Sequence, residues 1–234
     1  MEGVAHLLQW GASGKRYDIC HRGSACGLGR NVHDKSHARR DQVASIISAM
    51  EITQAQREVR ETFLGGFAGQ LVSAVLWLTS AVACTWKSFF LGELILILGG
   101  VLIFPLTQLV LRGMGHAYAL PKGHPMNALG TQVAFTLPLT LPLVLAIAAL
   151  RPNWFYPALM IALGAHYLPF IFLYGMWQFG ALSGLLIGAG LTVALYIPRP
   201  MSIGAWLTAA LLLAFALIGR QVAAHDFPRR RDSR

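Results

Sequence analysis

Six long apolar runs constrain this chain more than any other feature of its sequence. Each run is close to the 20 or so residues that an α-helix needs to cross about 30 Å of hydrocarbon. The runs are continuous rather than alternating, which excludes a transmembrane β-barrel. The sequence therefore predicts an all-α, polytopic membrane protein, a bundle of six transmembrane helices at 63–85, 89–111, 128–150, 154–174, 177–197 and 201–223.

Charge is scarce and unevenly placed along the chain. Only 12% of the 234 residues are charged and 55% are hydrophobic, whereas a soluble domain has about 25% charged residues. Sixteen of the 19 Lys and Arg fall before the first run, in the 112–127 loop, or from Arg220 near the end of the last run onward, and Lys87, Arg151 and Arg199 fall on the other side. Because positively charged loops stay inside, we predict that both termini are cytoplasmic.

The net charge of +9 follows from this topology together with attraction to anionic lipids at the cytoplasmic face. We expect the lipid bilayer and these lipids to be partners of the chain. No recognition motif accompanies the basic residues, so we expect no nucleic acid partner.

The chain before the first run divides into two parts. Residues 1–49 are rich in Gly, Arg, His and Ser and show neither helical nor strand periodicity, which predicts a disordered basic tail. We hypothesise that this tail is a non-native extension, because the helix-forming stretch 50–62 has the character of a protein start. We expect a juxtamembrane helix at 50–62, a transmembrane domain at 63–223 and a basic cytoplasmic tail at 224–234.

The spacing of the cysteines in the tail disfavours a zinc site. Suitable ligand types are present at Cys20, His21, Cys26, His33 and His37, but five residues separate the two cysteines. That gap is wider than the hairpin of a usual zinc finger. We therefore predict no metal and no cofactor.

Small residues at a spacing of four mark two helix faces suited to close packing. Lipid does not drive helices together by hydrophobicity, so close backbone approach matters more than in water. We interpret the two ladders as helix-packing faces that contact each other, a protein partner or both: Gly65, Gly69 and Ser73 in the first run, and Gly180, Gly184 and Gly188 in the fifth.

Prolines interrupt three successive runs. Each one removes a backbone hydrogen bond and favours a kink. The carbonyl that loses its partner is satisfied by a neighbouring Ser or Thr. Alternatively, the kinks together give the bundle a shaped interior. The predicted kinks lie at Pro105, Pro138, Pro142 and Pro169.

Three runs carry polar residues to a similar depth. At 1.5 Å per residue, Gln70, Thr136 and His166 each lie about 10–12 Å from the cytoplasmic edge. Gln132, Thr136 and Thr140 also share one helix face. We predict a polar intramembrane cluster of these five residues, whose stripe faces protein or water.

His166 and Glu93 are the ionisable residues at depth. His166 can bond structurally to Gln70, Thr136 or the carbonyl freed by Pro169, or act in a proton relay. A metal role is disfavoured, because no second ligand lies at its level. Glu93 lies about 6 Å below the outer edge, where it reaches the interface or meets one of the hydroxyls of Thr79, Ser80 and Thr192.

Two segments carry a family resemblance. "HPMNALG" (124–130) and "GAHYLPFIFLY" (164–174) resemble a family of small bacterial multi-pass inner-membrane proteins of unknown function, over roughly residues 55–220. The resemblance implies a bacterial inner-membrane protein, and it brings no activity, substrate or cofactor. Asn127 suits the N-cap of the third transmembrane helix.

Three classes of function fit these features. The prolines, the polar stripe and His166 favour a small transporter, channel or proton-coupled carrier. The glycine ladders favour the alternative, a non-catalytic assembly or sensory protein that acts as a homo-oligomer or with a membrane partner. A membrane enzyme is disfavoured, because the chain has no HExxH, GxSxG or paired carboxylates.

Overall fold

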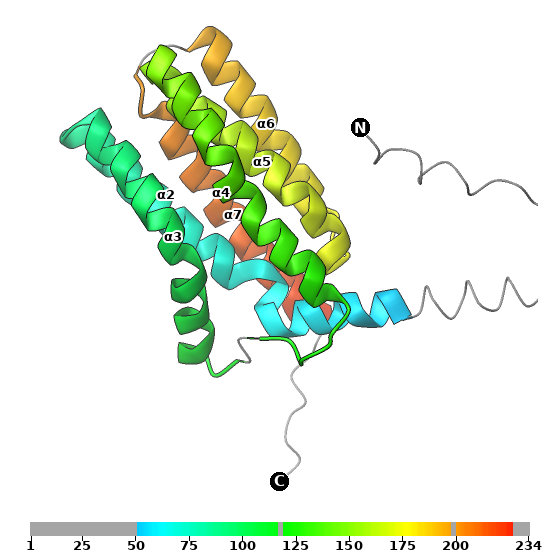
Figure 1. Ribbon diagram of the computed structural model, residues 1–234. Coiled ribbons are helices and arrows are strands. Elements are labelled where there is room, and N and C mark those ends of the chain that lie inside the picture. Colours follow the sequence, from blue (N-terminus) through cyan, green and yellow to red (C-terminus); the bar gives the residue numbers. More distant parts are fainter. Residues whose placement is uncertain (1–50, 117–118, 198–199, 227–234) are drawn as a thin grey trace, which may run out of the picture. The chain divides into compact units, whose positions relative to one another are not determined.

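The computed structural model describes residues 51–116, 119–197 and 200–226, and the predicted tails at 1–49 and beyond 226 lie outside this range. Within it, all regular structure is helical, and six helices are long and apolar enough to cross a membrane. The predicted fold class is thereby confirmed (Figure 1). After a helical segment at 51–63, the elements are η1 (Leu64–Gly66), α2 (Phe67–Trp86), α3 (Phe89–Gly113), α4 (Met126–Leu150), η2 (Pro152–Trp154), α5 (Phe155–Tyr174), α6 (Gln178–Tyr196) and α7 (Ile203–Asp226).

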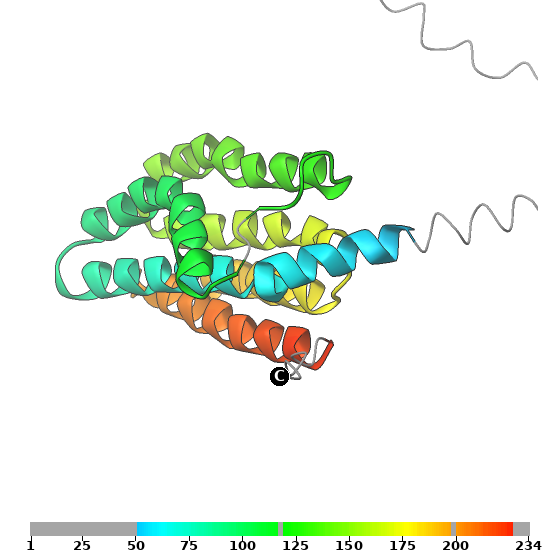
Figure 2. The same ribbon diagram turned by 90° about the horizontal axis from the view of Figure 1, so that it is seen from below.

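Sequential helices run antiparallel, which gives the bundle two ends. We call the end at which α2, α4 and α6 begin the proximal end, and the end at which α3, α5 and α7 begin the distal end. The most extensive interface joins α5 to α6, while α2 packs on both α3 and α7, and α4 packs mainly on α5. Figures 1 and 2 show these helices side by side along most of their lengths.

Two glycines allow α5 and α6 to approach closely. A Cβ atom at Gly164 would lie 2.7 Å from the side chain of Ile187 and 3.0 Å from the Ser183 carbonyl. At Gly190 it would lie 2.9 Å from the side chain of Ile161 and 3.0 Å from the Pro157 carbonyl. Any side chain at these positions would force the backbones apart, so these glycines permit the most extensive interface of the fold.

The second predicted glycine ladder is wrong as a packing face within the chain. Gly184 and Gly188 are exposed, and a Cβ atom there would meet nothing within 4 Å. Only Gly180 has a neighbour, the Ile171 side chain at 3.0 Å. The four-residue spacing places the glycines on one face of α6, but the opposite face, with Leu182 and Leu186, is the buried one.

The first ladder has a different outcome at each position. Gly69 faces Thr107 of α3 at 3.8 Å, which is ordinary contact, and Ser73 is buried. Gly65 instead allows a left-handed backbone conformation, since Leu64, Gly65 and Gly66 have φ values of 51°, 64° and 83°. This left-handed stretch separates the 51–63 helix from α2, and at Leu64 it costs about 1–2 kcal/mol. In Figure 1 the 51–63 helix leaves the direction of α2 at this point.

The predicted prolines lie inside their helices and end none of them. Figure 1 shows α3 bending along its length, in the part of the helix that carries Pro105. The helices α3 and α4 are also the least buried of the six. Leu102 and Phe104 of α3 and Leu139 of α4, for example, are exposed.

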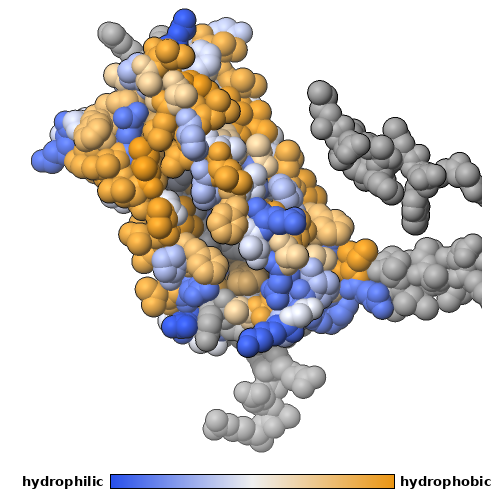
Figure 3. Space-filling model, in the orientation of Figure 1, coloured by the Kyte–Doolittle hydropathy of each residue, from blue (hydrophilic) through white to orange (hydrophobic). Residues whose placement is uncertain are grey.

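The surface has the character expected of a membrane protein. Apolar side chains cover most of the face drawn in Figure 3, and hydrophilic ones gather mainly towards its ends. Aromatic residues mark both ends. At the distal end Trp206 donates to the Thr85 hydroxyl at 3.1 Å and lies edge-on to Trp86. At the proximal end Trp177 is exposed. Such aromatic belts suit the two membrane–water interfaces.

Candidate functional site

The distal half holds a buried polar network in which every hydroxyl is satisfied. Ser80 of α2 donates to the Gly92 carbonyl of α3 at 2.7 Å, and it therefore accepts from the Tyr156 hydroxyl of α5 at 2.9 Å. Both Ser80 and Tyr156 are fully buried. Gly92 allows this contact, since a Cβ atom there would overlap the Tyr156 hydroxyl. The network ties three helices together and leaves no group free to bind a ligand.

The proximal half contains two buried amides without partners. Gln70 in the first turn of α2 and Gln178 at the start of α6 are only 3% and 5% exposed. Within the described chain, both amide atoms of Gln70 and Nε2 of Gln178 have no hydrogen-bond partner. A buried polar group left unsatisfied costs about 1–3 kcal/mol. These two side chains are therefore the strongest candidates for hydrogen bonding to a ligand at this end of the bundle.

The two amides converge on Gly219 of α7. The position of a Cβ atom there lies 2.9 Å from Gln178 Nε2, 3.2 Å from the Gly65 carbonyl oxygen and 3.8 Å from Gln70 Oε1. These are its three nearest heavy atoms, and all are polar. We call this arrangement of Gln70, Gln178, Gly65 and Gly219 the Gly219 site. It joins α2, α6 and α7 beside the left-handed break.

Aromatic and cationic groups surround the Gly219 site. The ring of Phe179, which follows Gln178, lies 3.0 Å from the position of a Cβ atom on Gly66. The Arg220 guanidinium carbon lies 5.1 Å from the centre of the Phe67 ring. The site is therefore bordered by packed aromatic rings, and the Arg220 guanidinium of α7 stacks on one of them.

The 51–63 helix is fixed to the proximal end by buried contacts. Ala55 and Val59 pack into the core, and Gln56 Nε2 donates to the Phe172 carbonyl at 2.6 Å. That carbonyl belongs to the last turn of α5, where helix carbonyls have no partner in their own helix. Gln56 also lies against Gly175, whose φ of 63° ends α5. The helix thus caps α5 and adjoins the break that leads to Gln70.

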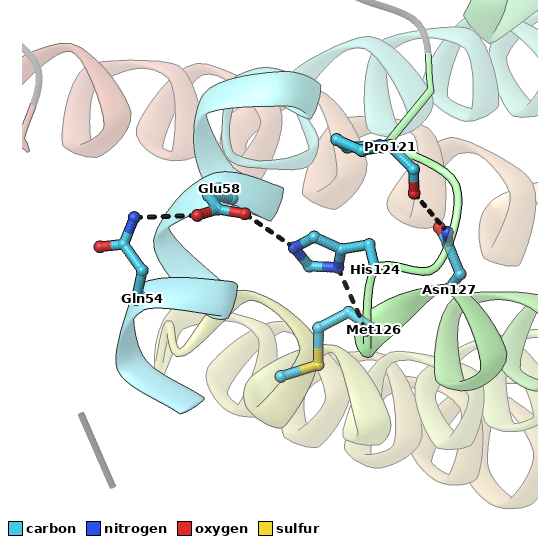
Figure 4. Close-up of polar contacts among 6 residues, drawn as sticks. All are labelled: Gln54, Glu58, Pro121, His124, Met126 and Asn127. Carbon is cyan, nitrogen blue, oxygen red and sulfur yellow. Dashed lines mark hydrogen bonds and ion pairs between the residues drawn. The ribbon is translucent and has the colours of Figure 1, made fainter. Parts of the chain in front are cut away.

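A hydrogen bond joins the same helix to the loop before α4. His124 Nε2 lies 3.1 Å from Glu58 Oε2, and the His124 side chain is only 5% exposed. Its Nδ1 accepts from the Met126 N–H at 3.2 Å, and Gln54 donates to the other Glu58 oxygen at 2.9 Å. Figure 4 shows His124 between Glu58 and the start of α4. The imidazole therefore connects two elements and caps a third.

Asn127 does not have the predicted capping role. The helix α4 begins at Met126, after Pro125, and Asn127 Nδ2 donates back to the Pro121 carbonyl at 3.0 Å. Pro125 occupies the N-cap position, and the His124 imidazole supplies the capping acceptor because it folds back onto the Met126 N–H. The segment that suggested the family resemblance is thus a structured turn (Figure 4).

His166 lies apart from Gln70, between α4 and α5. Its ring contacts Tyr167 and Phe170 and lies within hydrogen-bonding reach of the Val133 backbone, while Nδ1 is buried and has no partner among the described residues. The predicted hydrogen bond to Gln70 is wrong, because neither amide atom of Gln70 has a partner in that part of the chain.

Aromatic rings link the surroundings of His166 to those of the Gly219 site. Phe170 and Tyr167 pack against Phe179, with ring centroids 5.5 Å and 6.1 Å from it. Tyr174 lies 5.0 Å from the same ring. The polar level predicted from depth is therefore two separate polar positions with an aromatic cluster next to both.

The predicted stripe on α4 does not turn into the bundle. Gln132 and Thr136 are exposed and Thr140 is half-buried. The Thr136 hydroxyl donates to the Val133 carbonyl at 2.7 Å, and the Thr140 hydroxyl to the Leu137 carbonyl at 2.8 Å. These threonines satisfy their hydroxyls within their own helix.

Glu93 is half-buried near the distal end of α3. The hydroxyls predicted to meet it donate elsewhere: Thr79 to Val75, Thr192 to Gly188 and Ser80 to Gly92. Among the described residues no group of three His, Cys, Asp or Glu could hold a metal ion.

Sequence reasoning missed Gln178, Gly219 and the Glu58–His124 pair. Gln178 was placed at a helix start, where polar residues are ordinary, and Gly219 lies outside both ladders. The pair joins residues 66 positions apart, which no local pattern reports. A signal for Gln178 did exist, because it is a glutamine within the run 177–197.

Comparison with known proteins places the chain in a family without assigning an activity. No curated protein and no solved structure matches it. One family profile matches residues 52–221, a range that contains all six candidate spans. The chain therefore belongs to a family of unknown function, designated DUF7010.

Proposed function

We propose that this protein is a small bacterial inner-membrane carrier or channel, with the proximal end in the cytoplasm. The observation that carries the proposal is the pair of buried amides, Gln70 and Gln178. Both amide atoms of Gln70 and Nε2 of Gln178 lack partners among the described residues of an apolar bundle. A polar group at depth in a membrane is costly, and one without a partner is a candidate for a functional position.

Two further features support a transport role. The left-handed break at Leu64–Gly66 interrupts a helix beside the Gly219 site, and interrupted helices commonly form substrate sites in transporters. His166 lies near the same aromatic cluster with one ring nitrogen unpartnered in the described chain, which suits a proton-coupled carrier. Sixteen of the 19 Lys and Arg fall in the sequence segments that this orientation assigns to the cytoplasm, which supports a cytoplasmic proximal end.

Reconstitution tests the proposal. Full-length protein in proteoliposomes is challenged with an osmotic gradient of urea or glycerol, and with a pH gradient reported by an internal dye. We expect flux above that of empty liposomes for at least one probe, and its loss in Gln70→Met. Liposomes as tight as protein-free ones for all probes would overturn the proposal.

A second function is favoured by the exposed glycine face of α6. Gly184 and Gly188 meet nothing within 4 Å in the chain, which leaves a smooth surface for a second copy or a membrane partner. In this assembly role, Gly184→Leu abolishes crosslinking between copies in the membrane and leaves thermal stability unchanged. Gly100→Leu, at another open glycine, is the matched control that leaves both unchanged.

A further inference from the structure

We propose that the Gly219 site binds a small uncharged molecule that both donates and accepts hydrogen bonds, as water, urea and primary amides do. The inference deepens the proposed function and rests on it for the passage of such a molecule. The binding itself is argued from the contacts below.

The ligand chemistry follows from the atoms that face the site. Around the position of a Cβ atom on Gly219 lie one donor, Gln178 Nε2 at 2.9 Å, and two acceptors, the Gly65 carbonyl at 3.2 Å and Gln70 Oε1 at 3.8 Å. Gln70 Nε2 is a second buried donor without a partner among the described residues. A molecule that bonds to both kinds of group needs donors and acceptors of its own.

An anion does not fit these atoms. Two helix N-termini adjoin the site, and such ends favour anions when their N–H groups are free. Here the Phe67 N–H donates to the Leu64 carbonyl, and the Gly180 N–H donates to the Trp177 carbonyl at 2.9 Å. The Gly65 and Gln70 oxygens would also repel a negative charge. The nearest atom, an amide N–H₂ group, would repel a cation.

The ligand is small because the site is closed. Gln70 and Gln178 are at most 5% exposed, and Gly219 is buried. Because Gly219 has no side chain, no carbon atom stands between Gln178 Nε2, the Gly65 carbonyl oxygen and Gln70 Oε1. A molecule the size of water or urea therefore suits the site, whereas a sugar or a nucleotide would need the helices to part.

Gly219→Ala is the sharpest variant, because it fills the site without removing a polar group. The new methyl would meet Gln178 Nε2, the far end of a flexible side chain that can swing aside. Alanine is also the better helix former. Gly100→Ala makes the same change in α3, where nothing lies within 4 Å, and serves as the matched control. Gln178→Met is a second variant that removes the donor.

The experiment uses full-length protein in lipid nanodiscs with ¹⁵N-labelled glutamine. Magnetisation transfer from water to the Gln178 side-chain amide, identified by its loss in Gln178→Met, reports an occupied site. We expect transfer in the parent and in Gly100→Ala, and at least a fivefold loss in Gly219→Ala. No transfer in the parent, or unchanged transfer in Gly219→Ala, would overturn the proposal.

Titration with urea distinguishes the two sources of the same chemistry. Saturable shifts of the Gln178 amide that are absent in Gly219→Ala identify a solute site, and transfer from water that urea leaves unchanged identifies a resident water. Saturable shifts with sodium chloride or sodium acetate, but not with urea, would overturn the uncharged ligand. An occupied site in a protein that gives no flux would sink the transport role and leave the binding site standing.

Discussion

The two halves of the bundle treat buried polar groups in opposite ways. At the distal end Tyr156, Ser80 and the Gly92 carbonyl form a chain in which each hydroxyl has a partner. At the proximal end Gln70 and Gln178 are also buried, yet both amide atoms of Gln70 and Nε2 of Gln178 have no partner in the described chain. The contrast teaches that a polar residue inside a membrane helix does not by itself mark a functional site. Its unmet hydrogen bonds do.

The largest expected effect is at the distal end. Ser80→Ala leaves the buried Tyr156 hydroxyl and the Gly92 carbonyl without their side-chain partner. We expect the free energy of unfolding to fall by about 2 kcal/mol, because the buried Tyr156 hydroxyl loses this partner at a cost of roughly 1–3 kcal/mol, while the Gly92 carbonyl keeps its N–H donor within α3. Thermal melting in detergent measures it. Thr79→Ala, which removes an exposed hydroxyl bonded within its own helix, should melt like the parent; a similar loss there would remove the contrast.

The opposite sign is expected at the proximal end. Gln70→Met keeps the size of the side chain and removes two unpartnered polar atoms. We expect this variant to be at least as stable as the parent, by about 1 kcal/mol, while losing solute flux. A loss of stability as large as that of Ser80→Ala would mean that Gln70 has a structural partner, and the comparison of the two ends would fail.

A smaller effect is expected where the proximal end meets the 51–63 helix. His124→Ala removes the contact with the half-exposed Glu58 and the cap on Met126, which together contribute about 0.8 kcal/mol. We expect faster cleavage within residues 51–63 by added protease, with the transmembrane helices intact. Glu58→Gln retains a hydrogen-bond acceptor for His124 and should be cleaved at a rate close to that of the parent. Equal protection in His124→Ala would show that Ala55 and Val59 hold the helix unaided.

The smallest effect sharpens the same comparison at Tyr156. Tyr156→Phe removes one hydroxyl, while Ser80 keeps its bond to the Gly92 carbonyl. We expect a loss of about 0.5 kcal/mol, well below that of Ser80→Ala. A larger loss than that of Ser80→Ala would place the centre of the network on Tyr156.

The sequence allowed the six spans and the fold class to be predicted, because the length of an apolar run is set by the thickness of the hydrocarbon. It also singled out Gln70 and His166, since polar residues are rare at depth. It did not allow the faces of the helices to be assigned. A transmembrane helix is apolar on all sides, so nothing in α6 distinguishes the buried Leu182 and Leu186 from the exposed Gly184 and Gly188. The rotation of α6 about its axis is set by contacts with neighbouring helices, such as that with Gly164 of α5, and these contacts are visible only in the structure.

The one-sided packing of α3 makes the surrounding lipid part of the fold. This helix packs mainly on α2, and its 25 residues extend about 37 Å at 1.5 Å per residue, against roughly 30 Å of hydrocarbon. The excess is accommodated by tilt and by the bend in the part of the helix that carries Pro105. A thicker bilayer should therefore draw α3 upright and change its contact with Gly69, one residue from Gln70. Membrane thickness then acts on the proximal amides through hydrophobic mismatch.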